Sequence, residues 1–296
     1  MIGELTRERL TMQIRKAVIT AAAPGQNRLP LQQLVDRDGE EKTALQLVLE
    51  ECWTSGIEDV CVVISPGDEA AFVTATGQYD GNVTFVTQEK PLGYSNALLR
   101  TKEFVGTASF LHLVGDHLYL SENDTTCASQ LLDVARGSGC AVSAVQSTRE
   151  NSLPHFGIVG GRPVAGHQGL FDVDHVFEKP TPTYAEQSLV TPGLRSGHYL
   201  GFFGMHVLTH QVLKLLEELP AEQNSRKTTL SDALNLLPSR EKYLAFQTRG
   251  HRCNLGVKYG LLRAQLAIGL SGKDRDRILT ELVDLLANRY EGASKK

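Results

Sequence analysis

The sequence predicts an α/β fold: a doubly wound, mostly parallel, Rossmann-like sheet with an inserted, partly antiparallel lobe and C-terminal helices. Three observations carry this prediction. Strand-like apolar runs alternate with helical patterns through the first half of the chain, as in parallel sheets with right-handed crossovers. Beyond Arg149, short strand-like runs separated by Gly- and Pro-rich loops replace that alternation. Helical periodicity then returns and continues to the C-terminal region.

The first half is predicted to contain five strand and helix passes. The run at residues 59–64 is apolar throughout after Asp59, as expected of a parallel strand covered on both faces. The expected strands cover residues 17–20, 59–64, 83–87, 109–114 and 140–145. The expected helices cover residues 41–54, 68–75, 95–104 and 124–135. We expect these helices to lie on both faces of the sheet.

The second half is predicted to hold the inserted lobe and four helices. Its strands are expected at residues 156–159, 173–178 and 198–204, and its helices at 209–219, 229–236, 259–270 and 274–289. The last helix carries one apolar stripe, formed by Ile278, Leu282, Leu285 and Leu286. We expect this stripe to pack on its own domain, with contact to a second copy of the chain in a homodimer or higher homo-oligomer as the alternative.

The predicted units are an N-terminal arm (1–15), a main domain (16–270) and a C-terminal helix (271–296). Within the main domain, about 16–149 form one half and about 150–205 form the inserted lobe. Composition supports a substantial core, because the 296 residues are 41% hydrophobic and 22% charged.

Charge and cysteine usage exclude several classes of protein. The net charge is −4 and no basic run occurs, so we expect no binding of nucleic acid or of an anionic membrane. No apolar run has the length of a membrane helix, and residues 1–15 lack the apolar core of a secretory signal. Scattered cysteines without paired spacing predict buried thiols and a cytoplasmic location; they are Cys52, Cys61, Cys127, Cys140 and Cys253.

The segment after the first strand is the strongest pointer to function. Its small residues leave backbone N–H groups bare, so a flat base or a phosphate can approach closely; they are Ala21, Ala22, Ala23 and Gly25. Arg28 follows as a cation for phosphate oxygens. Open α/β sheets bind ligands at the carboxyl ends of strands. The segment therefore predicts a nucleotide site, with an ordinary tight turn and a surface arginine as the alternative.

Eight short motifs occur in order between Lys16 and Leu270. They are Ala17-Val-Ile-Thr-Ala-Ala22, Gln88 with Pro91-Leu-Gly93, Gly115-Asp116, Phe156-Gly-Ile-Val159, Glu178-Lys-Pro180, Gly204 with Val207-Leu-Thr209, Leu230-Ser-Asp-Ala-Leu234, and Gly256 with Lys258-Tyr-Gly260. Together they resemble the sugar-1-phosphate nucleotidyltransferases, and most closely the bacterial UTP:glucose-1-phosphate uridylyltransferases.

This resemblance implies a set of site residues. It places the nucleotide at Ala21, Ala22, Ala23, Gly25, Gln88 and Gly93. It places the sugar at His117, Gly157 and Glu178. It implies phosphate-binding or catalytic roles for Asp116, Lys179 and Arg28, and metal binding by Asp116 and Asn254. The amide of Gln88 offers one donor and one acceptor, which suit uracil or thymine. The side chains of Glu178 and Lys179 would point to opposite faces if both residues lay on a regular strand.

The implied reaction is Mg²⁺-assisted attack by a sugar-1-phosphate on the α-phosphorus of a nucleoside triphosphate. Glucose-1-phosphate and UTP are the favoured substrates, and the products are an NDP-sugar and pyrophosphate. A phosphate oxygen that is already anionic at pH 7 needs no general base, so catalysis requires alignment and charge neutralisation.

Three positions depart from the family pattern. The family's Gly-x-Gly-Thr-Arg motif reads Ala23-Pro-Gly-Gln-Asn27 here, so that Arg28 stands one position later than the family's arginine. The lysine of the family's Pro-Lys-Glu motif is missing, and Arg37 is the nearest cation. Asn254 replaces an acidic residue of the family. Two alternatives therefore stay open: a catalytically idle relative that binds nucleotides or nucleotide-sugars, and a glycosyltransferase of similar fold. A dinucleotide-dependent dehydrogenase is disfavoured, because no Gly-x-Gly-x-x-Gly follows the first strand.

Overall fold

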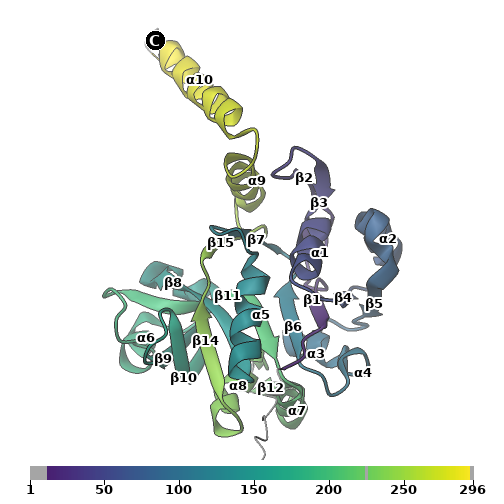
Figure 1. The fold of residues 1–296 in the computed structure, drawn as a ribbon, viewed down its shortest axis with the longest axis vertical. Coiled ribbons are helices and arrows are strands. Elements are labelled where there is room, and N and C mark those ends of the chain that lie inside the picture. The colour runs from purple at the N-terminus through teal and green to yellow at the C-terminus, as the bar shows by residue number, and fades with distance from the viewer. Residues whose placement is uncertain (1–11, 224–225, 294–296) are drawn as a thin grey trace, which may run out of the picture.

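A nine-stranded mixed sheet forms the centre of the molecule (Figure 1). The computed structural model describes residues 12–223 and 226–293, so most of the predicted N-terminal arm lies outside the described residues. In sheet order the strands are β5 (Val83–Thr87), β4 (Asp59–Ile64), β1 (Lys16–Thr20), β6 (Phe110–Val114), β11 (His198–Leu208), β8 (Ala141–Arg149), β14 (Tyr243–Gln247), β10 (Leu170–Glu178) and β9 (Gly157–Pro163).

The first four strands of this order are parallel, and they confirm four of the five strands predicted in the first half of the chain. The fifth, expected at residues 140–145, is β8, which runs parallel to β14. The apolar runs of β1, β4 and β6 are buried on both faces, as the hydrophobic pattern of β4 predicted, whereas the edge strand β5 is only partly buried. The carboxyl ends of β1, β4 and β6 lie at one edge, because β1 pairs in register with both neighbours from Lys16 to Thr20. This edge carries the loop that follows β1, residues 21–28, which we call the first loop.

The predicted lobe is partly antiparallel, as expected, and its strands belong to the same sheet. β11 runs antiparallel to β6 and β8, while β10 runs antiparallel to β14 and β9. The sheet is therefore parallel at one side and mixed at the other. β11 joins the two sides, because its C-terminal part pairs with β6 and its N-terminal part with β8 and β9.

Helices cover both faces of the sheet, as predicted. On one face, α1 (Ala44–Thr54) and α5 (Cys127–Ser138) pack against Ile19 and Val62. On the other face, α3 (Tyr94–Leu99) and α7 (His210–Glu218) pack against Val18 and Val63. The remaining helices of the main domain are α2 (Glu69–Thr76), α4 (Lys102–Val105), α6 (Pro182–Ser188), α8 (Leu230–Leu236) and α9 (Gly260–Leu270).

Two helix predictions need correction. The helix expected from residue 41 begins at Ala44, because Thr43 and Gln46 form a reciprocal capping box. The residues before it form β3 (Glu41–Thr43), which pairs with β2 (Gln33–Val35). The single helix expected at 95–104 is wrong: α3 and α4 are separate, and the hydroxyl of Thr101 between them donates to the carbonyl of Leu98.

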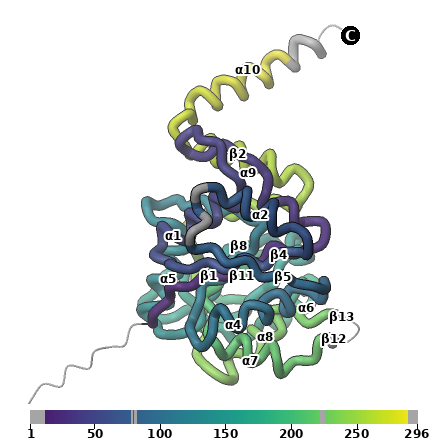
Figure 2. The backbone as a smooth tube through the Cα atoms, turned by 90° about the vertical axis from the view of Figure 1, so that its right-hand side faces the viewer, coloured from purple at the N-terminus to yellow at the C-terminus, as the bar shows by residue number. Residues whose placement is uncertain are grey.

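The C-terminal helix α10 (Arg275–Ala293) extends away from the body of the molecule (Figure 2). Ile278 lies against Gly269 of α9, but the side chains of Leu285 and Leu286 are 59% exposed. The prediction that the whole stripe packs on its own domain is therefore wrong, because the stripe extends beyond its contact with α9. Contact with a second copy stays a prediction.

Two further findings bear on the sequence analysis. The five cysteines are free, and all but Cys253 are buried, as predicted. Within residues 12–223 and 226–293, no helix combines the length and apolarity that crossing a bilayer would need.

A short two-stranded sheet that was not predicted borders the candidate site. It pairs β7 (His117–Ser121) with β15 (Gly250–Asn254).

Candidate active site

A cavity of about 310 Å³ lies at the carboxyl ends of the parallel strands. Six of the predicted site residues line it: Ala21, Ala22, Ala23, Gln88, Gly93 and Asp116. Gly25 and Arg28 do not, although Pro24 and Gln26 beside them do. The side chain of Arg28 is exposed. The structure therefore gathers most of the predicted nucleotide site but leaves Arg28 outside the lining of the cavity.

The first loop is held against the neighbouring strands by backbone contacts. The N–H of Ala21 donates to the carbonyl of Val63 at 2.8 Å, and the N–H of Gly115 donates to the carbonyl of Thr20 at 2.9 Å. A Cβ atom at Gly115 would lie 3.0 Å from that same carbonyl oxygen, so a larger residue would push the strand ends apart. Farther along, Asn27 Nδ2 donates to Asp68 Oδ2 at 2.6 Å.

Gln88 follows β5 and is buried, with both N–H donors of its amide used inside the protein. Nε2 donates to the carbonyl of Gly93 at 2.9 Å and to Asn96 Oδ1 at 3.0 Å. Gly93 itself caps α3 with a φ of 102°, a conformation that favours glycine. These bonds leave the Gln88 carbonyl oxygen as the group that the side chain can offer to a base.

Asp116 ends the tight turn after β6 and supplies the carboxylate of the cavity. Burial raises the pKa of this carboxyl, but hydrogen bonds from His117 and from its own backbone outweigh burial and hold the pKa below its usual value. His117 Nδ1 lies 2.8 Å from Asp116 Oδ1. His117, predicted to contact the sugar, is thus buried against the carboxylate that it orients, and its sugar contact stays a prediction.

The donor set around Asp116 suits a metal held mainly by its substrates. The N–H of Leu255 donates to the backbone carbonyl of Asp116 at 2.8 Å, and Asn254 pairs with His117, but Asn254 does not line the cavity that Asp116 lines, so its metal contact stays a prediction. Asn254 Oδ1 already accepts from the N–H of Gly256 at 2.8 Å. Among the described residues, no group of three or more His, Cys, Asp or Glu side chains could hold a metal by itself. One ionised carboxylate with phosphate oxygens is a typical ligand set for Mg²⁺.

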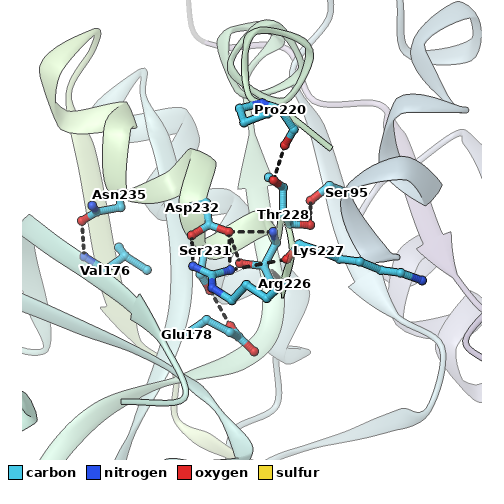
Figure 3. Close-up of polar contacts among 11 residues, drawn as sticks. Ser95, Val176, Glu178, Pro220, Arg226, Lys227, Thr228, Ser231, Asp232 and Asn235 are labelled. Atoms are coloured by element: carbon cyan, nitrogen blue, oxygen red, sulfur yellow. Dashed lines mark hydrogen bonds and ion pairs between the residues drawn. The ribbon is translucent and has the colours of Figure 1, made fainter. Parts of the chain in front are cut away.

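Glu178 and Lys179 lie on the mixed side of the sheet, where β10 ends. Lys179 has a φ of 51° and therefore does not continue the strand. Its Nζ lies 4.0 Å from Glu178 Oε1, so the two side chains share one side and the opposite-face expectation is wrong. Ser231 of α8 donates to Glu178 Oε2 at 2.6 Å and orients that carboxylate (Figure 3).

Gly157 begins β9 and pairs with Glu178. A Cβ atom at Gly157 would lie 2.6 Å from Phe202 Cδ2 and 2.7 Å from Ser231 Oγ. Packing within the protein therefore already requires glycine here. The predicted contact of Gly157 with a sugar stays a prediction.

Lys227 is a lining residue that the sequence analysis missed. It belongs to β13 (Arg226–Lys227), which pairs with β12 (Glu222–Gln223). In Figure 3 its side chain extends away from the Arg226–Asp232 ion pair, and its Nζ donates to the carbonyl of Pro91 at 2.5 Å. Arg226 contacts both oxygens of Asp232, at 2.6 and 2.8 Å. This ion pair anchors the segment that brings the ammonium group of Lys227 to the cavity. In the sequence, the only signal for Lys227 is its position just before the Leu230–Leu234 motif.

The fold and the cavity define an α/β protein with a cavity at the carboxyl ends of its parallel strands, the place where open α/β sheets bind ligands. The sequence profile of the family described as Nucleotidyl transferase matches residues 30–268, and the chain belongs to that family.

Relatives and solved structures agree with this assignment. The chain is 27% identical to the UTP--glucose-1-phosphate uridylyltransferase YngB of Bacillus subtilis, covering 93% of this chain and 96% of the relative. It is 25% identical to the UTP--glucose-1-phosphate uridylyltransferase of Streptococcus pneumoniae, covering 88% and 92%. A UDP-glucose pyrophosphorylase complexed with UDP-glucose has a TM-score of 0.71 at 19% identity, covering 86% and 98%. UTP-bound UGPase from Acinetobacter baumannii has a TM-score of 0.71 at 22% identity, covering 92% and 99%. These structures share the fold.

Proposed function

We propose that this protein transfers a uridylyl group from UTP to glucose-1-phosphate, forming UDP-glucose and releasing pyrophosphate. The observation that carries the proposal is one cavity in which the charged carboxylate of Asp116 faces the small-residue loop and Gln88. The names of the relatives support the choice of substrates. The relatives are UTP--glucose-1-phosphate uridylyltransferases, and this chain matches them over nearly their whole length.

Base selection is assigned to Gln88. Its carbonyl oxygen remains as an acceptor, because both amide hydrogens are bonded to Gly93 and Asn96. Uracil and thymine carry an N–H donor at N3, whereas neutral cytosine carries an acceptor there. Gln88 therefore favours the two keto pyrimidines over cytosine, and uracil is preferred here on the names of the relatives.

The transfer needs alignment more than acid–base chemistry. An anionic oxygen of glucose-1-phosphate attacks the α-phosphorus, the new P–O bond forms, and the bond to the β-phosphate oxygen breaks, so pyrophosphate leaves. Lys179 neutralises the attacking phosphate, and Glu178, oriented by Ser231, accepts hydrogen bonds from sugar hydroxyls. Asp116 would hold Mg²⁺, which supplies neutralisation of the crowded phosphates, and Asn254 is proposed as a second, neutral ligand.

The remaining assignments follow the same reaction. Arg28, exposed beside the loop, is assigned to the departing pyrophosphate, and Gly25 to the backbone that faces the triphosphate. The four buried free thiols support a reducing compartment, the cytoplasm.

The test is pyrophosphate release across a grid of four nucleoside triphosphates and several sugar-1-phosphates in the presence of Mg²⁺. We expect the highest kcat/KM for UTP with glucose-1-phosphate. Tight UTP binding with no pyrophosphate from any pair would replace this proposal with the idle relative. Sugar transfer from UDP-glucose without pyrophosphate chemistry would replace it with the glycosyltransferase.

A further inference from the structure

A second cavity, of about 1180 Å³, lies between α9, β15 and the end of β8, and its lining is rich in positive charge. The cations in its lining are Arg149, Arg252, Lys258 and Arg263. The carboxylate in its lining is Glu122, whose Oε1 already lies 2.8 Å from His251 Nε2. A concave surface with this excess of cations attracts anions.

Arg252 is the most confined of these cations. Its guanidinium carbon lies 3.6 Å from the centre of the Phe156 ring, which fixes the plane of the group. Its Nη2 is buried and has no hydrogen-bond partner among the described residues. Burial lowers the pKa of this guanidinium to about 10. A buried charged donor without an acceptor is costly, so the protein alone leaves this group incomplete.

The position of Arg252 relates the second cavity to the candidate active site. Arg252 and Asn254 lie two residues apart on β15, so their side chains share a face. Phe156, on which Arg252 stacks, accepts a hydrogen bond at its carbonyl from the N–H of Lys179 at 3.0 Å. Arg252 is therefore related to Asp116 through Asn254, which pairs with His117, and to Lys179 through Phe156. It does not line the cavity of the first loop.

We propose that this cavity binds the phosphate group of a small molecule through Arg252, with Lys258 and Arg263 adding positive charge around it. The planar guanidinium offers parallel N–H donors that match two phosphate oxygens. The volume exceeds that of phosphate alone, so the ligand class is a phosphorylated molecule of about sugar size. This ligand is separate from the sugar-1-phosphate acceptor, because the phosphate of the acceptor is assigned to Lys179, which does not line this cavity. The inference goes beyond the proposed transfer, because binding here requires no reaction.

The test measures binding alone. The full chain is titrated with inorganic phosphate, without Mg²⁺ or nucleotide, and the thermal midpoint is compared with that in chloride of equal ionic strength. We expect phosphate to raise the wild-type midpoint. Arg252→Met, which keeps an apolar stem against Phe156, should weaken phosphate binding at least about tenfold, and Arg252→Lys less so. Arg240→Met, which changes an exposed arginine paired with Glu218, should bind phosphate as the wild type does.

A folding defect is distinguishable from a lost ligand contact. Because Arg252→Met removes an unpartnered buried charge, its midpoint without phosphate should equal or exceed that of the wild type. No phosphate effect on the wild type, or an equal effect on the wild type and Arg252→Met, would overturn the proposal. Displacement of phosphate by glucose-6-phosphate, with or without displacement by glucose-1-phosphate, supports a separate phosphorylated ligand, whereas displacement by glucose-1-phosphate alone would assign the cavity to the acceptor and overturn the proposal. Neither result depends on whether uridylyl transfer occurs.

Discussion

The two sides of the sheet build their parts of the site in different ways. On the parallel side, the first loop, Gln88 and Asp116 each follow directly after a strand, and backbone groups and short side chains line the cavity. On the mixed side, Glu178 and Lys179 depend on side chains from other elements, such as Ser231 of α8. The first side forms a shaped surface for a flat base and phosphates, whereas the second forms a set of oriented charges. We therefore expect that binding of the nucleotide and binding of the sugar phosphate can be weakened separately.

The sharpest break of the parallel side is Asp116→Ala. Loss of the charged carboxylate removes the protein ligand proposed for Mg²⁺, so we expect kcat to fall at least about a hundredfold. Steady-state pyrophosphate release measures it. Asp133→Ala, which changes an exposed aspartate on α5 that lies 3.7 Å from Arg136, is the matched control. Wild-type turnover in Asp116→Ala would remove this carboxylate from the reaction.

Lys179→Met tests the charges of the mixed side. Removing an ammonium group that meets a phosphate should raise the KM for glucose-1-phosphate about 10- to 100-fold. The KM for UTP should stay within about twofold if the two sides bind separately. Lys214→Met, an exposed lysine of α7, controls for net charge. A parallel rise in both KM values would contradict the division of roles.

Gln88→Met tests whether the parallel side selects the nucleotide base. It removes the carbonyl acceptor and the two internal bonds to Gly93 and Asn96. We expect kcat/KM for UTP to fall about tenfold and the preference for UTP over CTP to shrink by a similar factor. Competition assays with both nucleotides measure the preference. An unchanged preference would move base recognition to the backbone.

Gly157→Ala has the smallest expected effect and tests stability. Its Cβ would enter the space of Phe202 and Ser231, so we expect the free energy of unfolding to fall by about 1–3 kcal/mol. Gly137→Ala is the matched control, because no atom lies within 4 Å of its Cβ position in α5. Gly137→Ala should raise the free energy of unfolding by up to about 1 kcal/mol, because alanine favours the helix more than glycine does. Denaturant unfolding measures both; equal stability of the two variants would show that packing does not require Gly157.

The same contrast explains what the sequence could predict. The parallel strands and their order of elements followed from apolar runs and their spacing, and Ala21, Gln88 and Asp116 could be placed because each ends or follows a strand. The strand ends meet at one edge, so contiguous motifs predict one cavity. Where local signals compete, as at Thr101, the predicted single helix was wrong.

Contacts between distant segments had no local signal. Ser231 and Glu178 are 53 residues apart, and Lys227 and Pro91 are 136 apart. Neither pair shows a periodicity or a spacing that predicts contact. The left-handed backbone at Lys179 also has no signal in its residue type, because lysine rarely adopts it. Side-chain orientation on the mixed side therefore had to come from the structure.

The central claim is that the Asp116 carboxylate holds the metal ion beside the reacting phosphates. Mn²⁺ in place of Mg²⁺ tests it directly, because its unpaired electrons broaden the ³¹P resonances of nearby phosphates. We predict that Mn²⁺ broadens both phosphates of UDP-glucose bound to the wild type, and that Asp116→Asn, with UDP-glucose still bound, loses this broadening. Equal broadening in the two proteins would contradict the account.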